Sequence, residues 1–307
     1  MNKVRLSVIL PCLNCESVIA TQLSALEQQR CDRPWEIIIS DNGSTDKTLE
    51  IVQQYQSRLP HLRVIDSSAR RGAGPARNLA VPFAQGDCIV FCDADDQVCP
   101  GWLQALANAL DHHQLVAGAL DLLALNQPWR IPDQHHFGTR ESPHTEAFRY
   151  RHAPHLRHAS ASNLALHKDL HFRINGFDES IAFNQDMDDC LRLQKLGCQL
   201  TFVPEAVINY HLRHSMAGTY RQGYRWGKYS VLIYKKHLGD QDIVQQFRFV
   251  FGGWRHLPAM ILKLRQRSDL FELAGWLGGR FGEINGCLTY LLAPKLKLGS
   301  QPLGNSG

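Results

Sequence analysis

The first 125 residues alternate short apolar runs with longer segments in which apolar residues recur at helical spacing. The short runs are typical of buried strands, and the longer segments of helices with one apolar face. Strands are predicted at residues 4–10, 35–40, 64–65 and 88–92, the first of them stopped by Pro11, and helices at 17–29, 45–55 and 75–84. This alternation predicts an α/β fold with a mostly parallel sheet and right-handed crossovers.

The pattern changes after residue 125. Residues 125–158 are rich in Pro, His, Gln and Arg and show little periodicity, which predicts an irregular excursion or a lid. Regular structure then returns, with strands predicted at residues 159–166 and 199–203 and helices at 185–196 and 217–236. We therefore expect the α/β fold to resume after the irregular stretch and to be followed by a helical extension.

Polar residues follow three of the predicted strands, in segments 40–46, 67–74 and 93–96. The carboxyl ends of parallel strands meet at one sheet edge, where ligands of open α/β sheets bind. Asp93 and Asp95 offer carboxylate oxygens, which Mg²⁺ and Mn²⁺ prefer and which can share such an ion with phosphate oxygens. The sequence predicts a metal site here, and an acidic turn that merely ends a strand is the alternative.

Four motifs stand in a fixed order along the first half of the chain. They are Val8-Ile9-Leu10-Pro11, Ser40-Asp41-Asn42-Gly43-Ser44-Thr45-Asp46, Gly74-Pro75-Ala76-Arg77-Asn78 and Phe91-Cys92-Asp93-Ala94-Asp95-Asp96. Together they resemble the nucleotide-binding half of family 2 glycosyltransferases, which have the GT-A fold. The resemblance continues through Ala161-Ser162-Asn163, Gly176-Phe177-Asp178-Glu179 and Gln185-Asp186 and covers residues 4–230. It implies a Rossmann-like sheet flanked by helices, a nucleotide-sugar donor and a divalent metal, Mg²⁺ or Mn²⁺.

On the donor side, the resemblance implies a role for several residues that follow the strands. Asp41 matches the acid that hydrogen-bonds the nucleotide base, commonly uracil, and Pro11 and Asn14 line the same pocket. Arg77 matches a residue that contacts the nucleotide and its phosphates, which suits a guanidinium fork. Asp93 contributes to the donor diphosphate site through the metal.

Two of these assignments have an alternative in the local sequence. Asp41 and Asp46 could both cap the helix predicted at residues 45–55, and we assign Asp46 to that role. Arg77 could be a surface charge on its own helix.

On the acceptor side, Asp178 and Glu179 belong to a turn that the resemblance places against the acceptor sugar, where Gly176 would permit the chain reversal. Asp186 matches the general base of the family. A carboxylate there would take the proton from an acceptor hydroxyl as that oxygen attacks the anomeric carbon opposite the diphosphate, which inverts the anomeric configuration.

The chain departs from the family pattern beside this base. Gln185 stands where the family has Glu, so a role for an ionised acceptor at that position is in doubt. Asp189 replaces a usually apolar residue. Asp188 and Asp189 are nearby alternative bases, although neighbouring side chains on a helix point in different directions.

Three further residues are implied by the resemblance later in the chain. His211 falls where many relatives carry a histidine near the metal, although a bystander role is as plausible in a chain with 15 histidines. Gln222-Gly223-Tyr224-Arg225-Trp226 reproduces the QxxRW pattern of processive polysaccharide synthases. We interpret Arg225 as a phosphate contact and Trp226 as a ring that stacks near the acceptor; a helix with a packed Trp and a solvated Arg is the alternative.

Composition and charge narrow the class of protein. The net charge of +4 and the hydrophobic content of 44% describe an ordinary globular protein and exclude a typical nucleic-acid binder. The nine cysteines are typical of reduced thiols that pack as small core residues, and the Cys12-Leu13-Asn14-Cys15 pair has no second pair at zinc-ribbon spacing. We recognise neither a signal peptide nor an apolar run long enough to span a membrane, so a cytoplasmic protein is expected.

Residues 245–292 mix aromatic and aliphatic residues with arginine and lysine. Such a segment could lie on the surface of an anionic membrane, as on the inner face of the cell membrane, or form an ordinary helical hairpin packed on the domain. Both interpretations stay open at this point.

These observations combine into one functional prediction. Residues 1–125 are expected to bind the nucleotide-sugar, residues 126–215 to bind the acceptor and carry the base, and residues 216–307 to form the helical extension. The predicted activity is an inverting, metal-dependent transfer of one sugar from a UDP-type donor to a glycan or lipid-linked acceptor in polysaccharide biosynthesis. A degenerate transferase that binds without turnover is the first alternative. A sugar-nucleotide pyrophosphorylase is the second, and it lacks support because no glycine-rich basic loop follows the first strand.

Overall fold

The computed structural model describes residues 5–131, 155–238, 247 and 250–293, together with the backbone of short strands at 138–139, 142–143 and 148–149. Within the irregular stretch predicted at residues 125–158, residues 132–137, 140–141, 144–147 and 150–154 lie outside the described residues, as do residues 245, 246, 248 and 249 of the basic, aromatic segment. The chain divides into two compact units, Met1–Leu212 and Arg213–Gly307.

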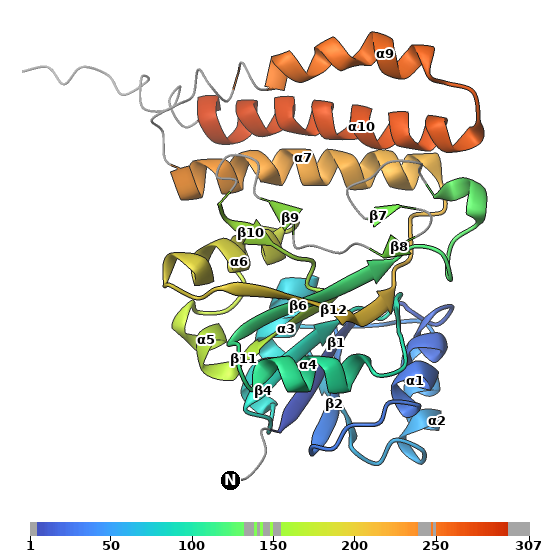
Figure 1. Ribbon diagram of the computed structural model, residues 1–307, viewed down its shortest axis with the longest axis vertical. Helices are drawn as coiled ribbons and strands as arrows, with labels where there is room; N and C mark the ends of the chain where they lie inside the picture. The colour runs from blue at the N-terminus through green and yellow to red at the C-terminus, as the bar shows by residue number, and fades with distance from the viewer. Residues whose placement is uncertain are drawn as a thin grey trace, which may run out of the picture. The chain divides into compact units, whose positions relative to one another are not determined.

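The first unit contains an eight-stranded sheet in the order β3-β2-β1-β4-β11-β6-β12-β5 (Figure 1). Its strands are β1 Leu6–Cys12, β2 Trp35–Asp41, β3 Leu62–Asp66, β4 Cys88–Cys92, β5 Gln97–Val98, β6 Leu115–Asp121, β11 Asn163–His167 and β12 Leu200–Asn209. Four neighbouring pairs are parallel, and the three pairs β4-β11, β11-β6 and β12-β5 are antiparallel. The sheet is therefore mostly parallel, as predicted.

The first strand continues past the proline that we expected to stop it. Pro11 and Cys12 still pair with β2, opposite Ser40 and Asp41. Pairing with β4 ends at Ile9, so Pro11 lies where the ladder has already ended on one side, a position where a strand tolerates proline. The extension carries β1 to the same edge as the end of β2.

Helices cover both faces of this sheet. They are α1 Ile19–Glu27, α2 Thr48–Gln56, α3 Ala73–Ala80, α4 Trp102–Leu110, α5 Lys168–Arg173 and α6 Gln185–Lys195, with short 3₁₀ turns η1 Val81–Phe83 and η2 Pro128–Arg130. Two-residue strands form separate pairs, β7 Gly138–Thr139 with β8 Ser142–Pro143 and β9 Phe148–Arg149 with β10 Arg157–His158. The predicted helices at residues 45–55 and 75–84 start and stop a few residues from these bounds, and β6 and α4 were not predicted.

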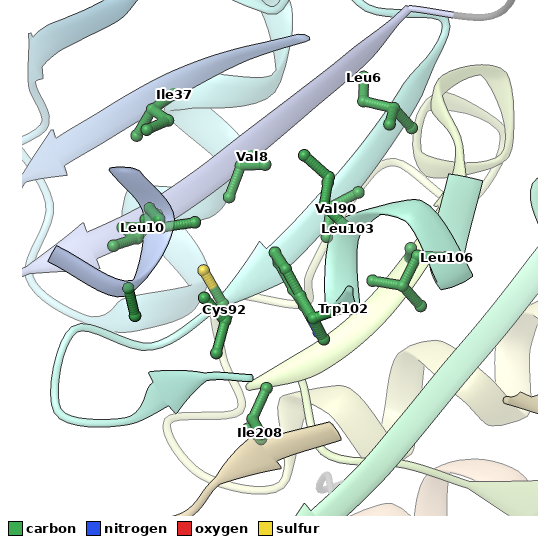
Figure 2. Close-up of a cluster of buried hydrophobic side chains, with 14 of the residues drawn as sticks. Leu6, Val8, Leu10, Ile37, Val90, Cys92, Trp102, Leu103, Leu106 and Ile208 are labelled. Atoms are coloured by element: carbon green, nitrogen blue, oxygen red, sulfur yellow. The ribbon is translucent and has the colours of Figure 1, made fainter. Parts of the chain in front are cut away.

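The central strands are apolar throughout because both of their faces are buried. Successive side chains of β1 and β4 alternate between two hydrophobic clusters: Val8 and Val90 join one, and Ile9 and Phe91 join the other. Figure 2 shows part of the first cluster, in which Trp102 of α4 lies with side chains of β1, β4 and β12. The indole N–H of Trp102 donates to Asn163 Oδ1 at 2.8 Å.

The cysteines are part of this packing. All nine are free thiols, and Cys12, Cys88 and Cys92 belong to the first cluster. Burial raises the pKa of the Cys88 thiol to about 12, so it stays protonated at neutral pH. The prediction that cysteines pack as small core residues is confirmed for Cys88 and Cys92.

The second unit is helical. It contains α7 Met216–Leu238, the 3₁₀ turn η4 Trp254–His256, α9 Leu257–Leu262, α10 Arg267–Gly286 and the π-helical turn η5 Cys287–Leu292. Glycines allow α7 and α10 to approach closely: a Cβ added at Gly282 would lie 2.0 Å from Tyr224 O, and one at Gly227 would lie 2.1 Å from Gly279 O. Within the described ranges, no helix combines the length and apolar character that crossing a membrane requires.

Candidate active site

Three strands place polar residues at one edge of the sheet. β1 and β2 are in register to their ends, with Cys12 opposite Asp41, and β4 ends at Cys92, directly before Asp93. Parallel pairing therefore brings the ends of β1, β2 and β4 together, as predicted from the order of the strands.

Asn42 joins the two loops that follow β2 and β3. Its Nδ2 donates to Ser67 O at 2.6 Å and to Arg70 O at 2.8 Å, and its Oδ1 accepts from the N–H of Gly72 at 2.8 Å. The side chain is buried, so these bonds fix the path of both loops on the way to α3. Asn42 was quoted in a motif but not assigned a role, because its partners lie 25 to 30 residues away.

Two residues predicted to bind the nucleotide-sugar, Asp41 and Asn14, make hydrogen bonds to the loop that follows β2. Asp41 is buried, and its Oδ2 accepts from the N–H groups of Gly43 and Ser44 at 3.2 Å each. Asn14 has φ 51, and its Oδ1 accepts from the N–H of Thr45 at 2.8 Å. The carboxylate of Asp41 therefore stabilises the turn at Gly43 and Ser44 through hydrogen bonds to their N–H groups. The predicted contact with the nucleotide base would be made from this position.

Asp46 forms the turn directly before α2, whose N-cap position is Lys47, so the assignment of Asp46 as the helix cap is not confirmed. Its Oδ1 accepts from Thr48 N at 3.0 Å and from Thr48 Oγ1 at 2.5 Å, and its Oδ2 accepts from the N–H of Glu16 at 3.0 Å. These bonds lower the pKa of the Asp46 carboxyl, although some burial opposes them.

Three carboxylates gather after β4. Asp93, Asp95 and Asp96 each offer an oxygen, and these oxygens lie within 4.8 Å of one another. Two oxygens that bind one ion at roughly 2.1–2.4 Å can be at most about 4–5 Å apart, so the cluster fits a hard divalent cation. Gln22 of α1 holds the loop in place, because its Nε2 donates to Asp93 O and its Oε1 accepts from Val98 N, both at 3.0 Å.

Asp96 is the member of this cluster that the sequence analysis did not assign. It is buried, and its Oδ1 accepts from the main-chain N–H of His211 at 2.9 Å. His211 therefore lies beside the acidic cluster, although among the described residues its ring is not part of the three-carboxylate group.

Arg77 is a buried cation next to the acidic cluster. Its side chain is 6% exposed, its Nη2 donates to Asp93 Oδ1, and its guanidinium lies 5.5 Å from the ring centroid of Phe177. The interpretation of Arg77 as a solvated surface charge is thus wrong. A buried guanidinium at this edge is suited to a phosphate anion.

Asp186 lies in the first turn of α6 and is partly buried. Its Oδ2 accepts from the N–H of Ala161 at 3.0 Å, and its Oδ1 accepts from that of Met187 at 2.9 Å. Burial raises the pKa of Asp186, which these bonds and the charge of Arg77 partly offset, whereas the charge of Asp93 adds to the rise. The predicted base therefore shares one electrostatic environment with Arg77 and Asp93.

Asp188 and Asp189 do not have the surroundings of a base. Their side chains are 0% and 4% exposed, and both accept from Arg192, at 2.7 Å to Asp188 Oδ2. Arg192 also donates to Ile174 O at 2.5 Å and to Gly176 O at 2.7 Å. This arginine, which the sequence analysis missed, joins α6 to the predicted acceptor turn, and its spacing of three and four residues from the two acids could have indicated the ion pairs.

The predicted acceptor turn is hydrogen-bonded to residues of the predicted nucleotide-binding half. Asn78 donates to Phe177 O at 2.8 Å and to Glu179 Oε1 at 3.0 Å, and Arg70 donates to Glu179 Oε2 at 2.6 Å. Asp178 Oδ1 accepts from Ser180 N at 2.9 Å. Glu179 therefore carries structural bonds that were not anticipated.

Gly176 is required in this turn. It has φ +67, and a Cβ there would lie 2.4 Å from Asn78 Oδ1 and 2.8 Å from His171 Nε2. The expectation that glycine permits the chain reversal is confirmed.

Gln185 packs against the start of α3. It is buried, and a Cβ added at Gly74 would lie 2.5 Å from Gln185 Oε1. The neutral amide thus fills the space left by the glycine. An ionised Glu at this buried position would carry a desolvation cost, so the surroundings favour the neutral Gln that stands here in place of the family's Glu.

Arg225 and Trp226 belong to α7 in the second unit. Arg225 is exposed, and the Trp226 side chain is 36% exposed. The neighbouring Gly223 faces α10, since a Cβ there would lie 2.2 Å from Gly275 O. Within the QxxRW segment, Gly223 therefore packs against α10, whereas Arg225 and Trp226 are exposed to solvent.

A mixed α/β sheet with an acidic cluster after β4, followed along the chain by a helical unit, is the architecture of glycosyltransferases of the GT-A type. Solved structures with this fold include the mannosyltransferase PcManGT from Pyrobaculum calidifontis in complex with GDP-Man and Mn²⁺ (TM-score 0.58, 18% identity, covering 96% of this chain and 78% of that one). Another is S. aureus TarS 1-349 in complex with UDP-GlcNAc (TM-score 0.58, 18% identity, covering 92% and 91%).

The chain belongs to glycosyl transferase family 2, whose family model matches residues 7–172. Among curated relatives, the amylovoran biosynthesis glycosyltransferase AmsB of Erwinia amylovora is 25% identical over 254 residues, covering 79% of this chain and 82% of AmsB. The poly(ribitol-phosphate) beta-N-acetylglucosaminyltransferase TarS of Staphylococcus aureus is 34% identical over 112 residues, covering 36% of this chain but 19% of TarS. The uncharacterized glycosyltransferases YfnE and YibD are likewise matched over 23% and 34% of their own length.

Proposed function

We propose that this chain is an inverting glycosyltransferase that moves one sugar from a UDP-sugar to a glycan or lipid-linked acceptor in polysaccharide biosynthesis. The observation that carries the proposal is the contact of the buried Arg77 with Asp93 of the acidic cluster. Arg77 lies on α3, whose Gly74 packs against Gln185, the residue directly before Asp186. Relatives that act in amylovoran and poly(ribitol-phosphate) chemistry support the substrate class.

On the donor side, Asp41 would accept from the base, with Pro11 and Asn14 beside it. Arg77 would donate to the diphosphate, and Arg225 would add a second phosphate contact from α7. Asp93, Asp95 and Asp96 would hold Mg²⁺ or Mn²⁺, and His211 is a further metal ligand in this proposal. When bound, the metal supplies charge neutralisation for the departing diphosphate.

On the acceptor side, Asp186 would accept the proton of the attacking hydroxyl, and its raised pKa suits that task. The hydroxyl oxygen forms a bond to the anomeric carbon as the bond to the diphosphate breaks, so one displacement inverts the configuration. Asp178 and Glu179 would line the acceptor site, with Trp226 stacking near the acceptor. Positioning of this kind and general-base assistance of about 10²–10⁴-fold are the two contributions that we assign to the protein.

Nine free cysteines support a reducing compartment, so we propose that the enzyme works in the cytoplasm. A lipid-linked acceptor would be met at the inner face of the membrane. The domain roles expected for residues 1–125, 126–215 and 216–307 are part of this proposal.

A panel of nucleotide-sugars with Mn²⁺ or Mg²⁺, followed by mass spectrometry of the released nucleotide, tests the proposal. We expect turnover that Asp186→Asn and Asp95→Ala reduce by two or more orders of magnitude, whereas Gln185→Glu retains more activity than Asp186→Asn. Asp169→Asn, an exposed carboxylate in α5, is the matched control and should leave turnover unchanged.

Two outcomes would contradict the proposal in different ways. Binding of nucleotide-sugars without turnover under all conditions would indicate the degenerate transferase instead. Turnover that survives both Asp186→Asn and Asp95→Ala would show that these side chains are not the base and the metal ligand.

A further inference from the structure

The turn between α9 and α10 exposes aliphatic side chains. Ile261 and Leu262 at the end of α9 are 51% and 81% exposed, and Leu270 in the first turn of α10 is 44% exposed. These three residues lie within one continuous stretch of ten, which we call the α9–α10 tip (residues 261–270). Aliphatic side chains that protrude this far are costly in water unless another surface covers them.

The same stretch is basic. Lys263, Arg265 and Arg267 are exposed, and residues 251–268 contain no acidic residue. Among the residues that the structure describes, neither Lys263 nor Arg265 is within ion-pair distance of a carboxylate. Lys263 and Arg265 therefore present two positive charges to an external anion.

The one acid of the tip faces the backbone. Asp269 Oδ2 accepts from the N–H of Arg265 at 2.8 Å and from that of Gln266 at 2.9 Å, completing a capping box at the start of α10. These bonds lower the pKa of Asp269. Its carboxylate therefore fixes the turn at the start of α10.

The tip is carried on packed helices. Within the second unit, Figure 1 shows α9 running alongside α10. Trp254, just before α9, makes edge contacts with Trp276 and Phe281 of α10, at 5.6 and 5.3 Å between ring centroids. The exposed aliphatic side chains are thus displayed by ordered structure.

We propose that the α9–α10 tip docks onto an anionic lipid bilayer. Protruding aliphatic side chains beside lysine and arginine are what an interfacial segment needs, because the former enter the acyl boundary and the latter meet lipid phosphates. An acidic protein could also pair with the cations. Protein interfaces are well packed, however, and three protruding aliphatic side chains do not form the continuous surface that such packing needs. This surface does not depend on which sugar the enzyme transfers, so the test below is independent of the proposed activity.

Flotation of the full chain with vesicles tests the inference. We expect the protein to float with phosphatidylcholine vesicles that contain phosphatidylglycerol at low salt, to float less at high salt, and to stay at the bottom with phosphatidylcholine alone. Lys263→Gln and Arg265→Gln should each weaken partitioning about fivefold. Leu262→Ser should weaken it about tenfold through the lost apolar insertion.

Matched controls come from the first unit. Leu196 is 47% exposed and Arg173 is exposed, so Leu196→Ser and Arg173→Gln remove similar side chains elsewhere and should leave flotation unchanged. The inference is overturned if the wild-type protein stays at the bottom with anionic vesicles. It is equally overturned if the tip variants float as well as the wild type. Unchanged circular dichroism of the variants excludes misfolding as the cause of lost flotation.

Discussion

Replacing Arg192 by alanine should destabilise the first unit severely. Arg192 is 18% exposed and pairs with two carboxylates that are 0% and 4% exposed, and it donates to the main-chain carbonyls of Ile174 and Gly176, at the start of the predicted acceptor turn. Removing one partner of a buried ion pair costs about 3–5 kcal/mol, because an uncompensated charge is left in a poorly solvated place. We expect a loss of that size in the free energy of unfolding for Arg192→Ala at neutral pH.

The matched control is Arg70→Ala. Arg70 also ties the acceptor turn, through Glu179, but this pair is 58% and 28% exposed. An exposed pair contributes about 0–1 kcal/mol, so Arg70→Ala should be nearly neutral. Both arginines contact the predicted acceptor turn, so a difference in stability between the two variants reports the burial of the Arg192 ion pairs.

Urea titration followed by tryptophan fluorescence and circular dichroism measures both variants. Burial already raises the pKa of Asp189 well above its usual range, and loss of Arg192 removes the charge that opposes this rise. A protonated carboxyl needs no counter-charge, so the penalty of Arg192→Ala should shrink as the pH falls. The reasoning is refuted if Arg192→Ala lies within about 1 kcal/mol of Arg70→Ala at neutral pH, or if its penalty grows in acid.

Two further predictions concern stability. Gly282→Ala should cost about 1–3 kcal/mol and lower the thermal midpoint of the second unit, because its Cβ would lie 2.0 Å from the Tyr224 carbonyl oxygen. Gly252→Ala, where a Cβ meets nothing within 4 Å, is the control in the same melting experiment, and equal midpoints for the two variants would contradict the close-packing argument. Burial, aided by the nearby charge of Arg192, lowers the pKa of His171 to about 4 from an ordinary 6.5, so the unfolded chain gains a proton before the folded one. Stability should therefore fall as the pH drops from 6.5 towards 4, by up to about 3 kcal/mol, and His171→Gln should flatten this dependence in urea titrations; parallel pH profiles would contradict the assignment.

Much of the first unit could be predicted because its information is local. The strand at residues 88–92 has the predicted bounds, since an apolar run ending before a polar loop needs no distant partner to be recognised. The turn at Asp46 before α2 and the reversal at Gly176 follow from turn chemistry within a few residues. The strand β6 Leu115–Asp121 was not predicted, although the turn at Asp111 separates it from α4.

The site could be predicted only as far as motifs mark it. Asp93, Asp95, Arg77 and Asp186 were named from their motifs, and the structure places Arg77 against Asp93. The roles expected for Arg225 and Trp226 stay predictions, as do those of Asp41, Asp178 and His211. Glu179 was expected to face an acceptor, and its bonds to Arg70 and Asn78 could not be foreseen because those residues lie about a hundred positions earlier in the chain.

The sequence by itself determined the α/β class, the family and the residues at the strand ends, because periodicity, turn chemistry and ordered motifs are properties of neighbouring residues. Tertiary structure decided which polar groups meet: Asn42 between two loops, Arg192 between α6 and the predicted acceptor turn, and Asp96 beside His211. It also decided that Gln185 fills the space beside Gly74 and that glycines bring α7 and α10 together. These contacts join residues far apart in the chain, so their energies depend on burial and close approach that no local pattern records.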